Sequence, residues 1–296
     1  MIEKILLFIL MLPALAGCGH RSGADAAHSG RTGTRTLAVS IEPLRAMLEP
    51  LAAGRFEVVG IMDRSADAES FEPSVSRRMA AEKAAGVFLT GMLPFEKSLA
   101  ASLPDSVAAV DLSRSVDLIY GTHDHDGDHA DADHKHGSPD PHLWTSARNA
   151  RRIVAAMAAE LTRLDPAGAG IYAVRRDSID RELRALDGYA DSLLRQAPAR
   201  SFLVWHPSLS YFARDYGLRQ VALGMEGKDL SASQLRGAIE TARSSGARVF
   251  LMERGADTGR ARSISAEVGA RAVEIDPMSA AWQEQIKLMA DELARH

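Results

Sequence analysis

Short apolar runs and longer amphipathic segments alternate along most of this 296-residue chain. Eight apolar runs have the length of single strands, at 36–41, 56–62, 86–91, 107–113, 201–206, 220–225, 248–253 and 271–276. Nearly continuous apolar strands are typical of parallel sheets that are buried on both faces. Helical patterns lie between them, at 43–54, 74–85, 231–246 and 257–270. This alternation of strand and helix predicts an α/β fold.

Two long helical segments interrupt the strand–helix units in the middle of the chain. The first covers 146–165, and the second begins at Asp165, a residue type that favours helix N-caps, followed by a proline. About 30 residues at 1.5 Å each give this second helix a length of roughly 45 Å. A single rigid helix restricts the motion of two lobes more than loose linkers do. We therefore predict two lobes, each with a four-stranded, mainly parallel sheet flanked by helices. The first lobe covers 36–165 and the second covers 198–296, and one long rigid helix at 166–197 joins them.

The N-terminus has the pattern of a targeting segment. An apolar stretch too short to be a permanent membrane helix ends in Leu-Ala-Gly-Cys, which resembles the lipobox of bacterial lipoproteins. We predict a signal peptide at 1–17, lipidation of Cys18, and a flexible tether at 18–35. The predicted location is the periplasm or the cell surface, with the lipid on Cys18 anchoring the protein to a bacterial membrane.

Composition and charge exclude several classes of partner. The chain is 46% hydrophobic and 25% charged, with a net charge of −4 and no basic run interleaved with aromatic residues. These values are typical of a soluble globular protein and argue against a nucleic-acid partner. Cys18 is the only cysteine, which excludes both an internal disulfide and a thiolate metal site. We expect the protein to be a monomer.

Polar side chains stand at the ends of several predicted strands. His206, Glu253 and Asp276 each end a strand, Glu69 lies in the loop after another, and His142 precedes the first long helix. Ligands of open α/β sheets bind beyond the carboxyl ends of the strands, so two facing lobes would bring such groups together. Nitrogen and oxygen ligands of this kind suit a divalent transition metal. Each residue also has a simpler interpretation, because strand-end carboxylates cap helices or pair with arginine and a strand histidine can be part of the core.

Four stretches of the chain resemble motifs of one protein family. They are ADAESFEPSVS, DPHLWTS, FLVWHPSLSYFARDYGL and EIDPMSAAWQEQIKLM, in the expected order and spacing. They are similar to the metal-binding solute-binding proteins of ABC transporters, the zinc- and manganese-uptake lipoproteins of the ZnuA type, often labelled adhesins. The resemblance runs from about residue 36 to the end. It implies capture of Zn²⁺ in a cleft between the lobes and delivery to an ABC transporter membrane permease.

The resemblance also implies a set of metal ligands, with one departure from the usual pattern. The implied ligands are Glu69, His142, His206 and Asp276, where zinc-binding members usually have histidine in place of Glu69. A glutamate is a competent ligand, but added oxygen character moves a site toward harder ions such as Mn²⁺. A manganese-specific protein of the same family is therefore the first alternative.

The segment 121–139 is rich in histidine and aspartate and has no apolar periodicity, which predicts a mobile loop. Its five histidines are His123, His125, His129, His134 and His136. Imidazole favours zinc over manganese, and such inserts resemble those of zinc-binding family members. We predict an accessory loop that gathers Zn²⁺ without forming the high-affinity site; the alternative is a solvated linker with no metal role.

Two further functions use the same residue types. A catalytic zinc also takes histidine and carboxylate ligands, but it keeps one position open for water. The chain has no HExxH or GxSxG motif, and four protein ligands leave no open position. We therefore predict that the protein is not an enzyme. A zinc-dependent hydrolase and a pure adhesin are less favoured alternatives to the transport function.

Overall fold

The structure is a computed structural model, and it describes residues 35–63, 66, 68, 70–120, 138–225, 228–229, 231–255 and 258–295. The predicted signal peptide, Cys18 and all of the predicted tether except Arg35 lie outside the described residues. The chain from Thr34 onward forms one compact unit. None of its described helices is both long and apolar enough to cross a membrane.

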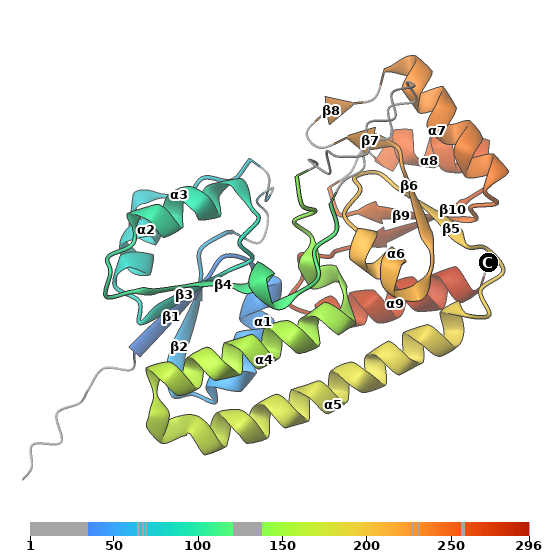
Figure 1. The fold of residues 1–296 in the computed structure, drawn as a ribbon. Helices are drawn as coiled ribbons and strands as arrows, with labels where there is room; N and C mark the ends of the chain where they lie inside the picture. Colours follow the sequence, from blue (N-terminus) through green and yellow to red (C-terminus); the bar gives the residue numbers. More distant parts are fainter. Residues whose placement is uncertain are drawn as a thin grey trace, which may run out of the picture. The chain divides into compact units, whose positions relative to one another are not determined.

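The first sheet is built from the four strands that the apolar runs predict. It consists of β1 (Arg35–Val39), β2 (Phe56–Gly60), β3 (Gly86–Leu89) and β4 (Ala108–Asp111). All neighbouring strands are parallel, in the order β2-β1-β3-β4. The helices between them are α1 (Glu42–Ala52), α2 (Val75–Glu82) and α3 (Pro94–Ser102). Parallel strands need such crossover connections, so the helical segments follow from the sheet (Figure 1).

The second sheet repeats this plan. Its strands are β5 (Ser201–Val204), β6 (Arg219–Ala222), β9 (Val249–Glu253) and β10 (Arg271–Ile275), all parallel in the order β10-β9-β5-β6. The helices are α6 (Ser210–Tyr216), α7 (Ala232–Ser244), α8 (Thr258–Val268) and α9 (Trp282–Arg295). The two parallel sheets confirm the predicted α/β fold.

The prediction of one strand over 220–225 is wrong. The chain leaves the sheet after β6 and forms β7 (Gly224–Met225), which pairs in antiparallel fashion with β8 (Lys228–Asp229). A Cβ atom on Gly224 would lie 3.0 Å from the carbonyl oxygen of Trp205. The backbone passes this close only because the residue is glycine.

Two helices run side by side below the sheets in Figure 1. α4 (Ala147–Leu164) leads through a 3₁₀ turn (Pro166–Gly168) into α5 (Ala169–Leu194), which has 26 residues and is about 39 Å long. α5 packs against α1 and α4 and also against α6 and α9, so it contacts helices that belong to both sheets. The predicted long connecting helix is confirmed, and it begins three residues later than predicted.

Asp165 stands where the sequence places a helix N-cap, but its side chain makes other contacts. The carboxylate accepts hydrogen bonds from Arg55 Nε at 2.5 Å and from the Tyr172 hydroxyl at 2.6 Å. The hydrogen bonds from Arg55 and Tyr172 lower the pKa of Asp165 to about 2. Asp165 therefore joins the end of α1 to the start of α5 instead of capping the helix.

One hydrophobic core continues from the first sheet to one face of the second. It includes large side chains from both sheets and from the helices between them, among them Phe88, Trp144, Tyr172, Phe202 and Phe212. A second, smaller core fills the other face of the second sheet, beneath α7 and α8. The two sheets thus share packing through α4, α5 and α9. The boundaries 36–165, 166–197 and 198–296 remain predictions.

Candidate metal centre

His142 is buried and its ring orientation is set by a neighbouring carboxylate. The side chain of His142 is 9% exposed, and that of Asp140 is 11% exposed. Asp140 Oδ1 accepts the backbone N–H of His142 at 2.8 Å and lies 2.9 Å from His142 Nδ1. Burial raises the pKa of Asp140, but the hydrogen bonds and charge of His142, together with Ser210, outweigh it and the pKa is lowered. An ionised carboxylate accepts hydrogen bonds, so this contact favours the tautomer of His142 with the proton on Nδ1 and the lone pair on Nε2.

His206 approaches His142 from the other sheet. It follows β5, and its Nε2 atom lies 3.1 Å from Nε2 of His142. The ring centroids are 4.9 Å apart and the ring planes are nearly perpendicular. Two imidazole nitrogens that bind one tetrahedral zinc at 2.0–2.1 Å are roughly 3.3–3.4 Å apart. The two Nε2 atoms therefore have close to the separation that a shared metal ion requires.

Asp276 lies in a segment that is tied to the His142 motif. Trp144, two residues after His142, is buried and donates its indole N–H to the carbonyl oxygen of Pro277 at 3.1 Å. The carboxylate of Asp276 itself pairs with Arg254 at 3.2 Å, and its backbone N–H donates to Gln285. The structure thus holds the Asp276 segment against the motif while the carboxylate binds an arginine.

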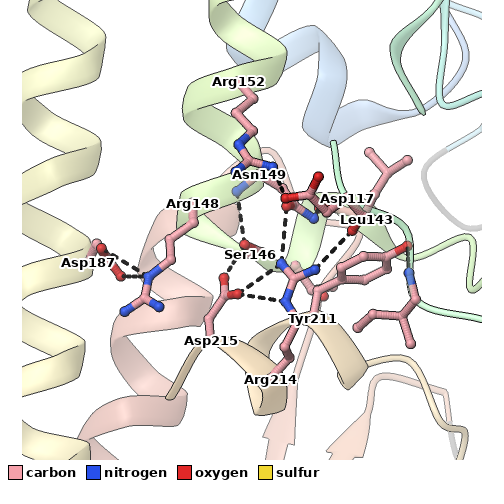
Figure 2. Close-up of polar contacts among 12 residues, drawn as sticks. Asp117, Leu143, Ser146, Arg148, Asn149, Arg152, Asp187, Tyr211, Arg214 and Asp215 are labelled. Carbon is pink, nitrogen blue, oxygen red and sulfur yellow. Dashed lines mark hydrogen bonds and ion pairs between the residues drawn. The ribbon is translucent and has the colours of Figure 1, made fainter. Parts of the chain in front are cut away.

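A polar network fixes the start of α4 relative to α6, as Figure 2 shows. Ser146 caps α4 by accepting the backbone N–H of Asn149, and its hydroxyl donates to Asp215 of α6. Arg214, also in α6, donates to the side chain of Asn149 at 3.2 Å and to the carbonyl oxygen of Asp117 at 2.9 Å. α4 starts five residues after His142 and α6 starts four residues after His206. The network therefore joins the two helices that follow the two histidines in the chain.

The residues on either side of the histidine-rich segment pair with each other. Tyr120 and Pro139 form an antiparallel bridge, and Asp140 donates its N–H to the carbonyl oxygen of Ile119 at 2.8 Å. The buried hydroxyl of Tyr211 accepts from the N–H of Ile119 and donates to the carbonyl oxygen of Asp140. Residues 121–137, with all five accessory histidines, lie outside the described residues. The end of the predicted loop, at Pro139, is part of the bridge.

The structure brings together only part of the predicted ligand set. Glu69 lies outside the described residues. Within the part of the chain that is described, no group of three or more histidine, cysteine, aspartate or glutamate side chains is close enough to hold a metal ion. Glu253, the other strand-end carboxylate, accepts a hydrogen bond from the Ser208 hydroxyl. Two imidazole nitrogens at this separation supply half of a four-ligand zinc site.

The residues that support the site were harder to find than the ligands. The prediction did not include Asp140 or Tyr211. Asp-Pro-His has a recognisable local signal, because an aspartate commonly accepts hydrogen bonds from the backbone two residues later. Tyr211 carries no such signal, because its partners Ile119 and Asp140 lie 92 and 71 residues away in sequence.

Comparison with known proteins identifies the class to which this fold and histidine pair belong. The family described as "ZnuA: Zinc-uptake complex component A periplasmic" matches residues 37–295. The "Zinc-binding lipoprotein AdcA" of Streptococcus pneumoniae is 25% identical over 295 residues, which cover 96% of this chain and 57% of that protein. The AdcA of Streptococcus pyogenes is matched over 39% of its own length. The chain thus spans about half the length of these relatives.

Solved structures give the same result at the level of the fold. A "Crystal structure of ZnuA" is 27% identical with a TM-score of 0.78 and covers 89% of this chain and 99% of that chain. The "Crystal structure of 138-173 ZnuA deletion mutant plus zinc bound" is also 27% identical, with a TM-score of 0.77 and coverage of 88% and 97%. The fold and the match over nearly the whole described chain define a metal-binding solute-binding protein. The chain belongs to the ZnuA family.

Proposed function

We propose that the protein captures Zn²⁺ outside the cytoplasm and delivers it to an ABC transporter permease. The observation that carries this proposal is the 3.1 Å approach of the Nε2 atoms of His142 and His206. His142 precedes the long α4–α5 segment in the chain and His206 follows it. Family membership and the zinc-binding names of the relatives support the same function. Imidazole nitrogens are ligands of intermediate softness, and two of them suit zinc.

The proposed ligand set is Glu69, His142, His206 and Asp276. Asp276 joins the two imidazoles when its carboxylate leaves Arg254, an exposed partner 3.2 Å away. Exposed ion pairs of this kind contribute only about 0–1 kcal/mol, so the exchange costs little. Glu69 supplies a second oxygen ligand. The mechanism is capture and release of an ion, with no chemical step.

Manganese is the competing cargo. Mn²⁺ binds imidazole more weakly than Zn²⁺ does in the usual order of divalent metals, and it prefers carboxylate oxygens. Two oxygen and two nitrogen ligands leave both ions possible on composition alone. The buried imidazole pair and the histidines of the accessory loop favour zinc.

The remaining parts of the proposal concern location and partners. Lipidation of Cys18 would anchor the protein to a bacterial membrane, with residues 18–35 as the tether. The protein would act as a monomer with the permease as its partner. A zinc-dependent hydrolase and a pure adhesin are alternative functions that we rank after transport. Turnover of ester, peptide or phosphate substrates by the metal-loaded protein would favour the hydrolase.

Isothermal titration of residues 19–296 with Zn²⁺ and with Mn²⁺ tests the proposed cargo. The proposed function requires one zinc site with a dissociation constant below about 1 µM, and manganese binding weaker than zinc binding. If neither ion binds more tightly than micromolar, capture for transport is wrong. Tighter binding of manganese would reverse the choice of cargo and keep the site.

Zinc should stabilise the protein strongly, and a chelator should remove this effect. At a free zinc concentration of about 100 times the dissociation constant, binding adds about 2.7 kcal/mol to the free energy of unfolding. For a chain of this size, that raises the Tm by roughly 5–10 °C. Differential scanning calorimetry with zinc, with zinc plus EDTA, and with magnesium as the control measures the shift. An equal shift with magnesium would contradict a nitrogen-rich site.

Deletion of residues 122–137 should leave the high-affinity site intact. The deletion joins Gly121 to Ser138 between the bridged residues Tyr120 and Pro139. A two-residue connection with glycine first suits a type II′ hairpin turn. We expect the zinc affinity to change by less than about threefold and the free energy of unfolding by less than about 1 kcal/mol.

The same deletion should remove weaker zinc sites. Titration of the deletion variant is expected to show the tight site and fewer additional ions bound per chain than the full protein. A loss of tight binding would place the site in the loop. An unchanged number of weakly bound ions would support the solvated linker.

A further inference from the structure

Asp140 contacts His142 more extensively than a simple turn residue would. One oxygen of its carboxylate accepts the backbone N–H of His142 at 2.8 Å and lies 2.9 Å from the ring nitrogen Nδ1. Because the two donors belong to the same residue, the carboxylate fixes both the backbone conformation and the ring orientation of His142. The opposite edge of the ring then points Nε2 at His206.

The backbone of Asp140 is itself held on both sides. Its N–H donates to Ile119 at 2.8 Å, and its carbonyl oxygen accepts from the hydroxyl of Tyr211 at 2.8 Å. Tyr211 is fully buried, and its hydroxyl also accepts from the N–H of Ile119 at 3.3 Å. Described residues on both sides of the histidine-rich segment, together with Tyr211, therefore hold the backbone of Asp140 in place.

Ser210 of α6 contributes to the lowered pKa of Asp140. Its hydroxyl accepts from Nε2 of Gln220 at 2.5 Å. Gln220 belongs to β6, and its side-chain oxygen accepts from the N–H of Leu209. The surroundings of Asp140 are thus linked to β6, the neighbour of the strand β5 that precedes His206.

We infer that Asp140 is the positioning residue of the metal site, which holds His142 in the Nδ1–H tautomer and so presents the Nε2 lone pair to the ion. This inference rests on the proposed zinc-binding function. A histidine ligand commonly donates its second ring N–H to a carboxylate, which fixes the tautomer and increases the basicity of the ligating nitrogen. We assign Asp140 a positioning role and not that of a ligand, because its Oδ1 atom faces the backbone N–H and Nδ1 of His142.

Two substitutions separate the charge of Asp140 from its hydrogen bond. Asp140→Ala removes both, and we expect a 10- to 100-fold loss of zinc affinity, roughly the range for a lost outer partner of a metal ligand. Asp140→Asn keeps the size but replaces the carboxylate with an amide, whose NH₂ group can donate to Nδ1 and so select the wrong tautomer. We expect a loss of similar size for this variant. Zinc affinity is measured by competition with a chelator of known affinity.

Asp117→Asn provides the matched control. Asp117 lies two residues before Ile119, just before the histidine-rich segment. Its carboxylate pairs with Arg152 at 2.5 Å and makes no described contact with His142. Its replacement should change zinc affinity by less than about twofold. An equal loss in this control would mean that zinc affinity depends on the net charge near the histidine-rich segment and not on the tautomer of His142.

A spectroscopic readout tests the tautomer directly in zinc-free protein. Long-range ¹H–¹⁵N correlation spectra distinguish the protonated from the unprotonated ring nitrogen of each histidine. We expect Nδ1–H at His142 in the parent protein and a shift toward Nε2–H in both Asp140 variants. An unchanged tautomer in both, or zinc affinities within about twofold of the parent, would overturn the inference.

A double-mutant cycle separates this inference from the proposed function. If Asp140 acts through His142, then Asp140→Ala has no further effect on zinc affinity in a His142→Ala background. Additive losses mean that Asp140 acts by another route. If the parent protein does not bind zinc, the proposed function fails, while the tautomer of His142 in zinc-free protein still tests the positioning role.

Discussion

Replacement of His206 with alanine is expected to reduce zinc affinity by more than about 100-fold, the largest binding effect of any single change. His206 supplies one of the two nitrogens that face each other at 3.1 Å. Loss of an outer partner alone costs 10- to 100-fold in metal affinity, so loss of a direct ligand should cost more. One imidazole and two carboxylates would remain, one protein ligand short of the proposed four-coordinate site. His142→Ala should give a loss of the same order.

Chelator competition measures this loss, and a loop histidine provides the control. His129→Ala removes a histidine from the accessory segment, and we expect the affinity of the tight site to stay within about twofold. The zinc-dependent rise in Tm should disappear in His206→Ala and persist in His129→Ala, since stabilisation follows the binding constant. If His206→Ala keeps the tight site while His129→Ala loses it, the candidate metal centre is in the wrong place.

The fold was predictable because its elements have strong local patterns. Near-continuous apolar runs mark all eight strands of the two parallel sheets, and α5 keeps apolar residues at helical spacing over its 26 residues. Element ends were less predictable. Gly224 divides the predicted strand 220–225, because the backbone there passes close to Trp205, a contact that no local pattern indicates.

The site was predictable only where its residues carry their own signal. His142 and His206 stand in distinctive motifs, and the structure brings their Nε2 atoms together. Asp165 has the sequence signal of a helix cap, but the arginine at position 55 takes its carboxylate, because a charged partner forms a stronger hydrogen bond than a backbone N–H. The pairing of Asp276 with Arg254 likewise depends on tertiary structure, and no local sequence pattern indicates it.

Trp144 is expected to be the residue whose loss most reduces stability. It is 2% exposed, and its indole N–H donates to the carbonyl oxygen of Pro277, 133 residues later in the chain. Trp144→Ala removes a large buried ring and should lower the free energy of unfolding by about 3–5 kcal/mol. Urea unfolding of zinc-free protein, followed by circular dichroism, measures this change. A loss below about 1 kcal/mol would show that the position is not part of the packed core.

Trp144→Phe isolates the hydrogen bond from the packing. Phenylalanine retains an aromatic ring beside His142 but leaves the carbonyl oxygen of Pro277 without its indole donor, at a cost of about 1–3 kcal/mol. Trp282→Phe is the control, a buried tryptophan of α9. Because Pro277 follows Asp276, Trp144→Phe should also weaken zinc binding, whereas Trp282→Phe should not. If Trp144→Phe loses stability but keeps full zinc affinity, the segment that carries Asp276 does not need this anchor to reach the metal, and Asp276 is then the weakest member of the proposed ligand set.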